Sequence, residues 1–207
     1  MAKILIASRE EAVDILTNPK YNKDVSAIVS ISSQNQSAPQ PVKKCQDKKD
    51  KIVLVLHFDD MEKIMIGNPR CKGWEPPQKK HIMSILEHSK NMLNSGGIIL
   101  CHCQAGISRS AAAAFILKCM ELGPGNEQEA LVEILKTKNS IGPNALMVEL
   151  ADEILGDKWD LMGALENINN LRKKLNYATD ATPETLSNML KKHPDVPIIG
   201  KGSIVRI

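Results

Sequence analysis

The chain has 207 residues, of which 43% are hydrophobic, and this suffices for one compact α/β domain but not for several independent ones. Its formal net charge of +3, from 27 Lys and Arg against 24 Asp and Glu, is too small to mark a surface for nucleic acid or anionic membranes. Aromatic residues make up only 3%, which also argues against stacking on single-stranded nucleic acid.

No segment of the sequence has the pattern of a secretory signal or a membrane span. The apolar run near the start, residues 4–7, is too short for a signal peptide. The longest apolar run, residues 111–117, falls far short of the roughly 20 residues of a membrane helix. The five cysteines form neither an even disulfide framework nor a set with zinc-finger spacing. We therefore expect a soluble, cytoplasmic protein with reduced thiols.

The first elements predicted along the chain are a short buried strand and a capped helix. Residues 3–7 predict the strand, and Ser8 with Glu11 forms a capping box for a helix that ends near Thr17. The β-branched residues 25–32 predict a second strand. This order of strand, helix and strand favours a parallel sheet with right-handed crossovers.

The middle of the chain predicts a loop, a strand and a long connection. Residues 33–50 are polar and rich in Lys, so we expect a loop. The continuously apolar residues 51–58 predict a central strand that is buried on both faces. The connection 59–76 contains several Gly and Pro residues and is long enough to be a functional lid. A helix is expected from Pro77 to about Asn94.

The second half of the chain is mostly helical. A short strand at 98–101 precedes a nearly all-apolar helix at 110–122, and a helix of that kind belongs in the middle of a fold. Further helices are expected at 126–138, 144–155 and 157–175. The predicted fold class is therefore α/β, with a central, mostly parallel sheet flanked by helices.

Residues 176–207 predict a weaker C-terminal extension. A short helix is expected from Thr182, and a small hairpin around residues 200–202. The sequence assigns no role to this extension. We therefore divide the chain into a main domain, residues 1–175, and the extension.

The strongest chemical signal lies between the strand at 98–101 and the helix at 110–122. The strand leads to His102, and a loop then runs to the start of the helix. In such a loop the backbone N–H groups converge and the helix end adds partial positive charge, so that together they bind a tetrahedral oxyanion. The residues expected to bind phosphate oxygens are Gln104, Ala105, Gly106, Ile107, Ser108 and Arg109.

Cys103 stands at the centre of this predicted anion site. The amides, the helix dipole and Arg109 should hold it as a thiolate, so it should act as a nucleophile at neutral pH. Attack on a phosphate monoester would give a cysteinyl-phosphate. Ser110 is placed to assist the sulfur in leaving, and His102 to orient the loop through its ring.

Residues 102–110 have the sequence His-Cys-Gln-Ala-Gly-Ile-Ser-Arg-Ser, and this stretch resembles the signature of the cysteine-dependent protein tyrosine phosphatases. Its residues are most similar to the signature of the compact dual-specificity type. The resemblance implies the fold of that superfamily for the main domain, hydrolysis of phosphorylated proteins or peptides, and no metal ion or organic cofactor.

Residues 1–170 also resemble a small, mostly bacterial branch of predicted tyrosine phosphatases. In that branch a strand ends in an Asp-Ile pair, which aligns with Asp60 and its successor. Enzymes of the family supply a general acid from an Asp upstream of the nucleophile. The resemblance therefore points to Asp60 as the acid, with Asp59 as the alternative and with Glu62 and Glu75 as outside candidates.

Three further residues each allow two interpretations. Asn144 is most simply a helix cap, although the resemblance also suggests that it supports the loop. Asp152 is expected as an exposed helix carboxylate. Cys71 is expected as an ordinary loop thiol rather than as a redox partner of Cys103.

Two alternative functions stay open at this stage. A pseudophosphatase would bind phosphorylated ligands without hydrolysing them, but every element of the reactive loop is present. The second alternative is a phosphatase of a phosphoinositide, an inositol phosphate or a nucleotide. Lipid-specific relatives tend to place lysines inside the loop, where this chain has the uncharged Gln104, Ala105 and Ile107. The sequence thus favours phosphopeptides, without distinguishing phosphotyrosine from phosphoserine or phosphothreonine.

Overall fold

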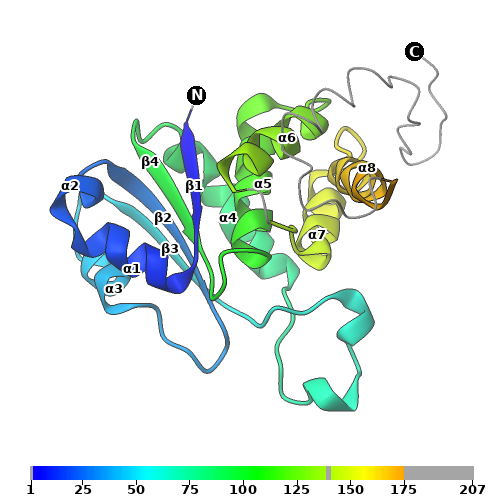
Figure 1. Cartoon of the computed structure of the whole chain (residues 1–207), viewed down its shortest axis with the longest axis horizontal. Coiled ribbons are helices and arrows are strands. Elements are labelled where there is room, and N and C mark those ends of the chain that lie inside the picture. Colours follow the sequence, from blue (N-terminus) through cyan, green and yellow to red (C-terminus); the bar gives the residue numbers. More distant parts are fainter. Residues whose placement is uncertain (1, 139–140, 175–207) are drawn as a thin grey trace.

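The computed structural model describes residues 2–138 and 141–174, and at its centre lies a sheet of four parallel strands (Figure 1). The strands stand in the order β1-β4-β2-β3. Every neighbouring pair is parallel, which confirms the α/β class and the parallel sheet predicted from the alternation of strands and helices. The strands are β1 Lys3–Ala7, β2 Val25–Ser32, β3 Ile52–His57 and β4 Ile98–His102.

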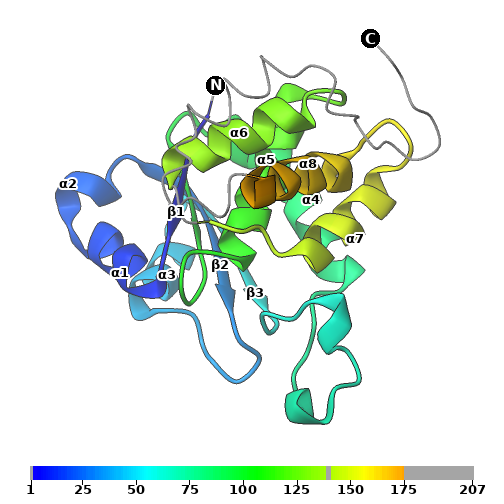
Figure 2. The same ribbon diagram turned by 45° about the vertical axis from the view of Figure 1, so that its right-hand side comes forward.

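Helices cover both faces of this sheet (Figures 1 and 2). One face packs against α1 and α3, and the other packs against α5 and the helices around it. The helices are α1 Arg9–Thr17, α2 Pro19–Asn22, α3 Gln40–Gln46, α4 Lys79–Leu93, α5 Arg109–Leu122, α6 Glu127–Thr137, α7 Ala145–Leu155 and α8 Leu161–Lys174.

Strand β2 shows how the two faces are divided. Ala27, Val29 and Ile31 point into the core around α5, whereas Ile28 points into the smaller core formed with α1 and α3. Leu100 of β4 lies on the same side as Ile28. Both faces bury apolar side chains, which is why β2 is so rich in Val, Ile and Ala.

Helix α5 lies in the middle of the fold, as its all-apolar sequence predicts. Every residue from Arg109 to Cys119 is buried, and the helix contacts three of the strands as well as α4, α6 and α7. Its first turns contain a run of four alanines, residues 111–114, whose small side chains allow the sheet and the neighbouring helices to approach closely. The amino end of α5 is thereby fixed at the carboxyl end of β4.

The prediction of a loop throughout residues 33–50 is wrong, because this segment contains α3. Pro41 occupies the first turn of the helix, where proline is tolerated, and Val42 and Cys45 are buried three residues apart on one face. The other positions are polar and exposed or half-buried, so only two apolar residues mark this helix in the sequence. Such a short stripe is hidden in a Lys-rich segment.

The strand predicted at residues 51–58 is present as β3, but its predicted central position is wrong, because β3 pairs only with β2 and lies at the edge of the sheet. Leu54 and Leu56 are buried towards α4 and α5, whereas Val53 and Val55 are only partly buried beside α3. Both faces of β3 therefore contact a helix although one of its edges is unpaired. This explains a continuous apolar run in an edge strand.

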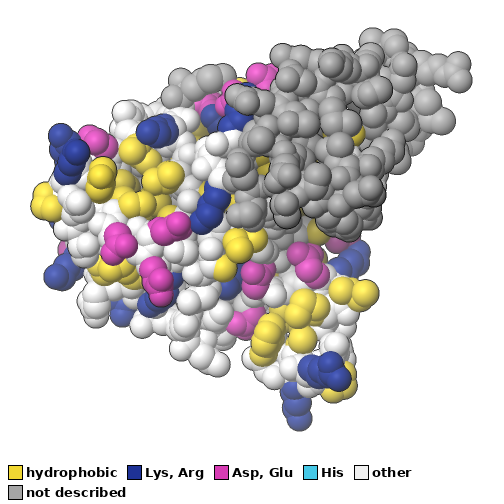
Figure 3. Space-filling model, viewed as in Figure 1, with side chains coloured by type: hydrophobic (Ala, Val, Ile, Leu, Met, Phe, Trp, Pro, Cys, Tyr) yellow, Lys and Arg dark blue, Asp and Glu magenta, His cyan; other side chains and the backbone are white. Residues whose placement is uncertain are grey.

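The connection between β3 and α4 extends away from the body of the protein (Figures 1 and 2). It contains two short 3-10 turns, Lys63–Met65 and Pro69–Cys71, and leads to α4, which begins at Lys79 after the N-cap Gln78. Figure 3 shows hydrophobic side chains gathered on this connection, with basic side chains at its tip. Its exposed large hydrophobic residues are Ile64, Ile66 and Trp74.

The last described helix, α8, begins at Leu161, four residues later than predicted. The amide of Leu161 donates to the carboxylate of Asp152, 3.0 Å away, and this contact marks the start of the helix. No helix within the described residues is long and apolar enough to cross a membrane. The helix and the hairpin predicted in the extension 176–207 lie outside the described residues.

Candidate active site

The loop that joins β4 to α5 is held against the first turn of the chain. Gly106 has a φ of +70°, and a Cβ placed on it would lie 2.5 Å from the backbone carbon of Ala7. Any other residue would be strained here and would also collide with the end of β1. The amide of Arg9 donates to the carbonyl of Gln104 at 3.1 Å. These contacts with residues 7–9 are the first of two sets of backbone contacts, here called clasps, that hold the loop.

The second clasp comes from the segment before α7. The amide of Gly142 donates to the carbonyl of Ile107 at 3.1 Å, and the amide of Asn144 donates to the carbonyl of Ser108 at 3.3 Å. Because both partners are backbone groups, they fix the path of the loop whatever its side chains are. Carbonyls of the loop are thus held by other segments, while the amides of Gly106 and Ser110 face the sulfur of Cys103.

Cys103 lies at the bottom of this loop, and its side chain is almost completely buried. Its Sγ is 3.2 Å from the hydroxyl oxygen of Ser110. Burial alone would raise the pKa of the thiol. The hydroxyl and amide of Ser110, the amide of Gly106 and the charge of Arg109 outweigh burial and hold the pKa below its usual value. The site therefore favours a thiolate.

Arg109 lies beside the same sulfur, and its side chain is buried. Its Nη1 donates to the carbonyl of Phe58 at 2.7 Å, which anchors the guanidinium to the end of β3. Its Nε makes no hydrogen bond but lies 3.7 Å from the carboxylate of Asp60. A buried guanidinium with an unbonded N–H can donate a hydrogen bond to an anionic oxygen at the mouth of the loop.

Asp60 comes well before the loop in the sequence, and its side chain lies at the rim of the loop. Its Oδ1 accepts hydrogen bonds from the hydroxyl of Ser108 at 2.7 Å and from the amide of Asn144 at 3.0 Å. Its side chain is 40% exposed, so the carboxylate faces both the loop and solvent. The structure thus places Asp60 at the rim of the same loop that contains Cys103, Arg109 and Ser110.

Asp59, the alternative acid, is engaged elsewhere. Its Oδ2 accepts from the amide of Glu75 at 2.9 Å, and its own amide donates to the carbonyl of Glu75 at 2.6 Å. These two bonds close the base of the protruding connection. The carboxylate of Glu75 itself forms an ion pair with Lys80 at 3.2 Å. Both residues therefore have local structural partners.

Glu62 caps α7. Its two carboxylate oxygens accept from the amides of Ala145 and Leu146 at 3.1 and 3.2 Å. Burial is the largest influence on its carboxyl group and raises the pKa, although both amides act in the opposite direction. The negative charge lies at the amino end of a helix, where it is stabilising.

His102 is buried immediately before Cys103. Its ring lies beside the backbone of Cys103, and burial, together with the charge of Arg9, lowers its pKa to about 4. Neither ring nitrogen has a hydrogen-bond partner of normal geometry among the described residues. A looser hydrogen bond to the backbone of Cys103 acts to raise the pKa of the ring, so the expectation that the ring orients the loop through hydrogen bonds has one direct partner.

Three residues make contacts in the site that the signature does not reveal. Ser108 and Asn144 hold Asp60, and Phe58 anchors Arg109 through its carbonyl. The alignment of Asn144 after a proline is the one sequence signal for them. By contrast, Asp152 is buried and holds the start of α8, so the expectation of an exposed carboxylate is wrong.

The other expected features lie apart from this site. Cys71 is half-buried in the protruding connection, and all five cysteines are free thiols. No group of three side chains that could hold a metal ion occurs within residues 2–138 and 141–174.

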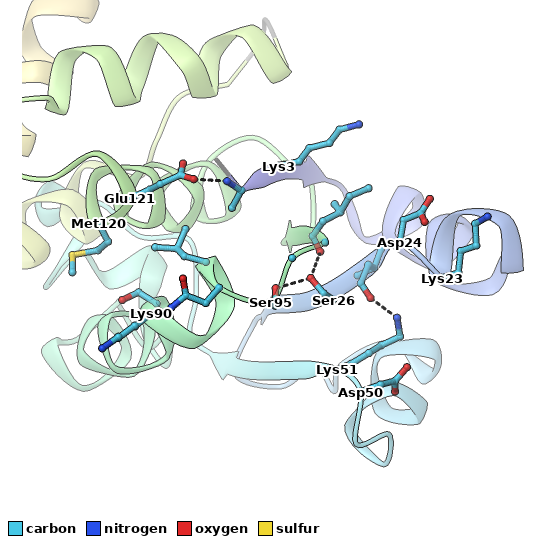
Figure 4. A pocket seen from close by; sticks show the side chains of 18 residues that line it. Lys3, Lys23, Asp24, Ser26, Asp50, Lys51, Lys90, Ser95, Met120 and Glu121 are labelled. Atoms are coloured by element: carbon cyan, nitrogen blue, oxygen red, sulfur yellow. Dashed lines mark hydrogen bonds between the residues drawn. The ribbon is translucent and has the colours of Figure 1, made fainter.

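A cavity of about 1170 Å³ lies at the amino ends of the strands, whereas the loop lies at their carboxyl ends (Figure 4). Its lysines and carboxylates are mixed, and several polar groups already bond to one another. Lys51 donates to the carbonyl of Asn22 at 2.8 Å, and the hydroxyls of Ser26 and Ser95 lie 2.6 Å apart. The residues that can perform chemistry on a phosphate therefore lie in the loop rather than in this cavity.

No model of a known protein family matches the chain, and no curated protein sequence matches it. Solved structures match it in fold. DUSP15 is 20% identical with a TM-score of 0.53, and the match covers 91% of this chain and 92% of that one. Human DUSP28 is 14% identical with a TM-score of 0.52, covering 81% and 94%. PTPMT1, solved in complex with PI(5)P, is 15% identical with a TM-score of 0.52, covering 75% and 92%.

Proposed function

We propose that this chain, which has the fold of the dual-specificity and related tyrosine phosphatases, hydrolyses phosphate monoesters through a cysteinyl-phosphate on Cys103. The observation that carries the proposal is the position of the Cys103 sulfur, 3.2 Å from the hydroxyl of Ser110 and beside the amides of Gly106 and Ser110. The lowered pKa of the thiol supports the same role.

In the first step the thiolate of Cys103 attacks phosphorus. The S–P bond forms as the bond from phosphorus to the ester oxygen breaks, and the leaving oxygen takes a proton from Asp60. The position of Asp60 at the rim, held by Ser108 and Asn144, supports this assignment over Asp59. Asp59 is bonded to the protruding connection instead.

In the second step water attacks the phosphorus of the intermediate. Asp60, now ionised, takes a proton from that water, and the S–P bond breaks to release phosphate and the thiolate. The hydroxyl of Ser110 can donate to the sulfur as charge returns to it. Arg109 and the amides of residues 104–108 stabilise the charge on the phosphate oxygens throughout, because they are fixed before the substrate arrives.

We propose a phosphorylated protein or peptide as the substrate. Gln104, Ala105 and Ile107 are the exposed side chains of the loop, and none of them is charged. A polyanionic headgroup would have no lysine within the loop to meet its further phosphates. A phosphoinositide is the second candidate, because PTPMT1, with the same fold, has been solved with PI(5)P. Activity on a phosphotyrosine peptide, a phosphothreonine peptide and PI(5)P in parallel separates these classes.

The decisive experiment for the reaction is the turnover of p-nitrophenyl phosphate in the presence of a chelator. Cys103→Ser should abolish it, whereas Cys71→Ser, a change in the protruding connection, should leave it intact. Undiminished turnover by Cys103→Ser would end the proposal. Tight phosphate binding by the wild type without any turnover would favour a non-catalytic phosphate-binding protein.

A further inference from the structure

A row of four polar side chains crosses the sheet on the face that α1 and α3 cover. The register pairs His102 of β4 with Ser30 of β2, and it pairs Ser32 of β2 with His57 of β3. Ser30 and Ser32 are two positions apart on one strand, so all four side chains point to the same face. The row begins at the residue before the proposed nucleophile.

Neighbouring residues confirm which face the row occupies. Ile28 and Leu100 lie one step nearer the amino end of the same face, and both belong to the core formed with α1 and α3. Ala38 and Val42 from the other side of this core are also buried. Ser30, Ser32 and His102 are therefore covered by protein, and the row reaches a half-buried position only at His57.

Most polar atoms of this row are buried without a partner of normal geometry, although His57 itself is half-buried. Ser30, Ser32 and His102 are 0%, 2% and 1% exposed. The atoms that are buried and lack a hydrogen-bond partner among the described residues include Ser30 Oγ, Ser32 Oγ, His57 Nδ1 and both ring nitrogens of His102. Buried polar atoms in folded proteins are almost always bonded, and internal water is the usual partner where protein atoms do not suffice.

The chemistry of the row suits water better than an ion. The row offers two imidazoles and two hydroxyls but no carboxylate or thiolate, so it is a poor cation site. The nearby charged group, Arg9, already donates to the carbonyl of Ser37 at 3.0 Å. The ring of His102 is neutral at pH 7 and so presents one donor and one acceptor. Water both donates and accepts, as this set of atoms requires.

We infer that Ser30, Ser32, His57 and His102 form an internal water site, and that its water holds the ring of His102 beside the backbone of Cys103. In this arrangement His102 is a positioning residue, and Ser30, its register partner on β2, supplies a hydroxyl on the same face of the sheet. The ring would then fix the start of the loop, whose amides lower the pKa of the sulfur.

A crystal structure of the full chain at high resolution tests the site directly. We expect water within hydrogen-bond distance of at least two side chains of the row, one of them His102. A row without water would overturn the inference. This test stands even if substitutions in the row prevent folding, and it does not depend on the phosphatase proposal.

The thermal midpoint of Ser30→Ala tests the same point with an opposite sign for each case. If Ser30 bonds to internal water, removing the hydroxyl takes a partner from that water and lowers the midpoint. If the hydroxyl is unpaired, removing it relieves an unfavourable buried group and raises the midpoint. Ser89→Ala is the matched control, because Ser89 is equally buried and its hydroxyl bonds within α4. An unchanged or higher midpoint for Ser30→Ala counts against the water site.

The effect on Cys103 is measured by its alkylation rate with iodoacetamide as a function of pH, which needs no substrate. A looser His102 ring would align the loop amides less well with the sulfur. We therefore expect the midpoint of the alkylation curve to rise by roughly half a pH unit in Ser30→Ala and to stay unchanged in Ser89→Ala. Equal midpoints in both variants would overturn the positioning role. Failure of phosphate hydrolysis would leave this result untouched.

Discussion

Nδ2 of Asn144 lies 3.0 Å from Oδ1 of Asp60, across 84 positions of the sequence. The same amide group donates to the carbonyl of Met61, and the side-chain oxygen of Asn144 accepts from the amide of Met147 to cap α7. One side chain therefore orients the proposed general acid and begins the helix beside it.

Replacing Asn144 by serine separates these two roles. Serine can still cap α7 but is too short to reach Asp60. We expect kcat on esters with poor leaving groups to fall about tenfold because the acid is no longer oriented, while KM changes little. The thermal midpoint should move by less than about 3 °C. Asn126→Ser, at an N-cap where the side chain makes no capping bond, is the control. Full kcat in Asn144→Ser would refute a catalytic role for the contact.

The identity of the acid is tested by exchanging two adjacent carboxylates for amides. Asp60→Asn should lower kcat on phenyl phosphate roughly 100-fold, and far less on p-nitrophenyl phosphate, whose phenolate leaves without a proton. Asp59→Asn should keep its activity, because the new amide oxygen can still accept from Glu75. The reverse pattern would move the acid to Asp59. Steady-state kinetics on both esters for both variants decide the matter.

Gly106 and Gly123 offer a matched pair for the loop. Both have positive φ, but a Cβ at Gly123 meets nothing within 4 Å, whereas at Gly106 it meets the backbone of Ala7 and Ser8. Gly123→Ala should lose about 1 kcal/mol of unfolding free energy from strain alone and keep its activity. Gly106→Ala should lose activity and phosphate binding as well, because the loop must move. Equal effects of the two changes in urea unfolding and turnover would show that the clasp is unimportant.

The pKa of the Cys103 thiol should depend on the hydroxyl of Ser110. Ser110 lowers the pKa of the thiol, so Ser110→Ala should move the alkylation midpoint of Cys103 to higher pH by roughly one unit, equivalent to one or two hydrogen bonds to the thiolate. The same variant should release the first equivalent of p-nitrophenol as a burst, because breakdown of the intermediate becomes slow. An unmoved midpoint would mean that Ser110 does not stabilise the thiolate.

The thiol of Cys103 also makes folding stability depend on pH. Its pKa is lower in the folded chain than the usual value of about 8.5 in the unfolded one, so between these values the unfolded chain binds more protons. Stability from the thiolate is therefore present in full above about pH 8.5 and is lost as the pH falls through the folded pKa. We expect the midpoint of wild type to rise relative to that of Cys103→Ser as the pH increases. A constant difference would contradict a lowered pKa.

Much of this architecture could be predicted because its signals are local. The capping box of Ser8 and Glu11, the bounds of β2 and the apolar helix α5 follow from neighbouring residues, and all three appear in the structure. The loop between β4 and α5 also forms where the signature places it. Short-range patterns thus place the proposed nucleophile, Cys103, and the proposed phosphate clamp, Arg109, in this loop.

What could not be predicted depends on contacts between distant residues. The sequence cannot show that β3 ends up at the edge of the sheet, because its apolar run is the same whether one or two strands pair with it. Helix α3 is too short to be stable by itself, and it is stabilised by packing against the face of the sheet that α1 also covers. The sequence around Asp152 predicts a surface carboxylate, because nothing in it shows that the start of α8 packs against this side chain.

The two clasps on the reactive loop lie far apart along the chain, at Arg9 and at residues 142–144. A ribosome therefore finishes the signature well before it delivers the second clasp. We therefore expect that a nascent chain ending after α6 lacks the contacts of residues 142–144 with the loop, and that the proposed site is complete only when α7 docks.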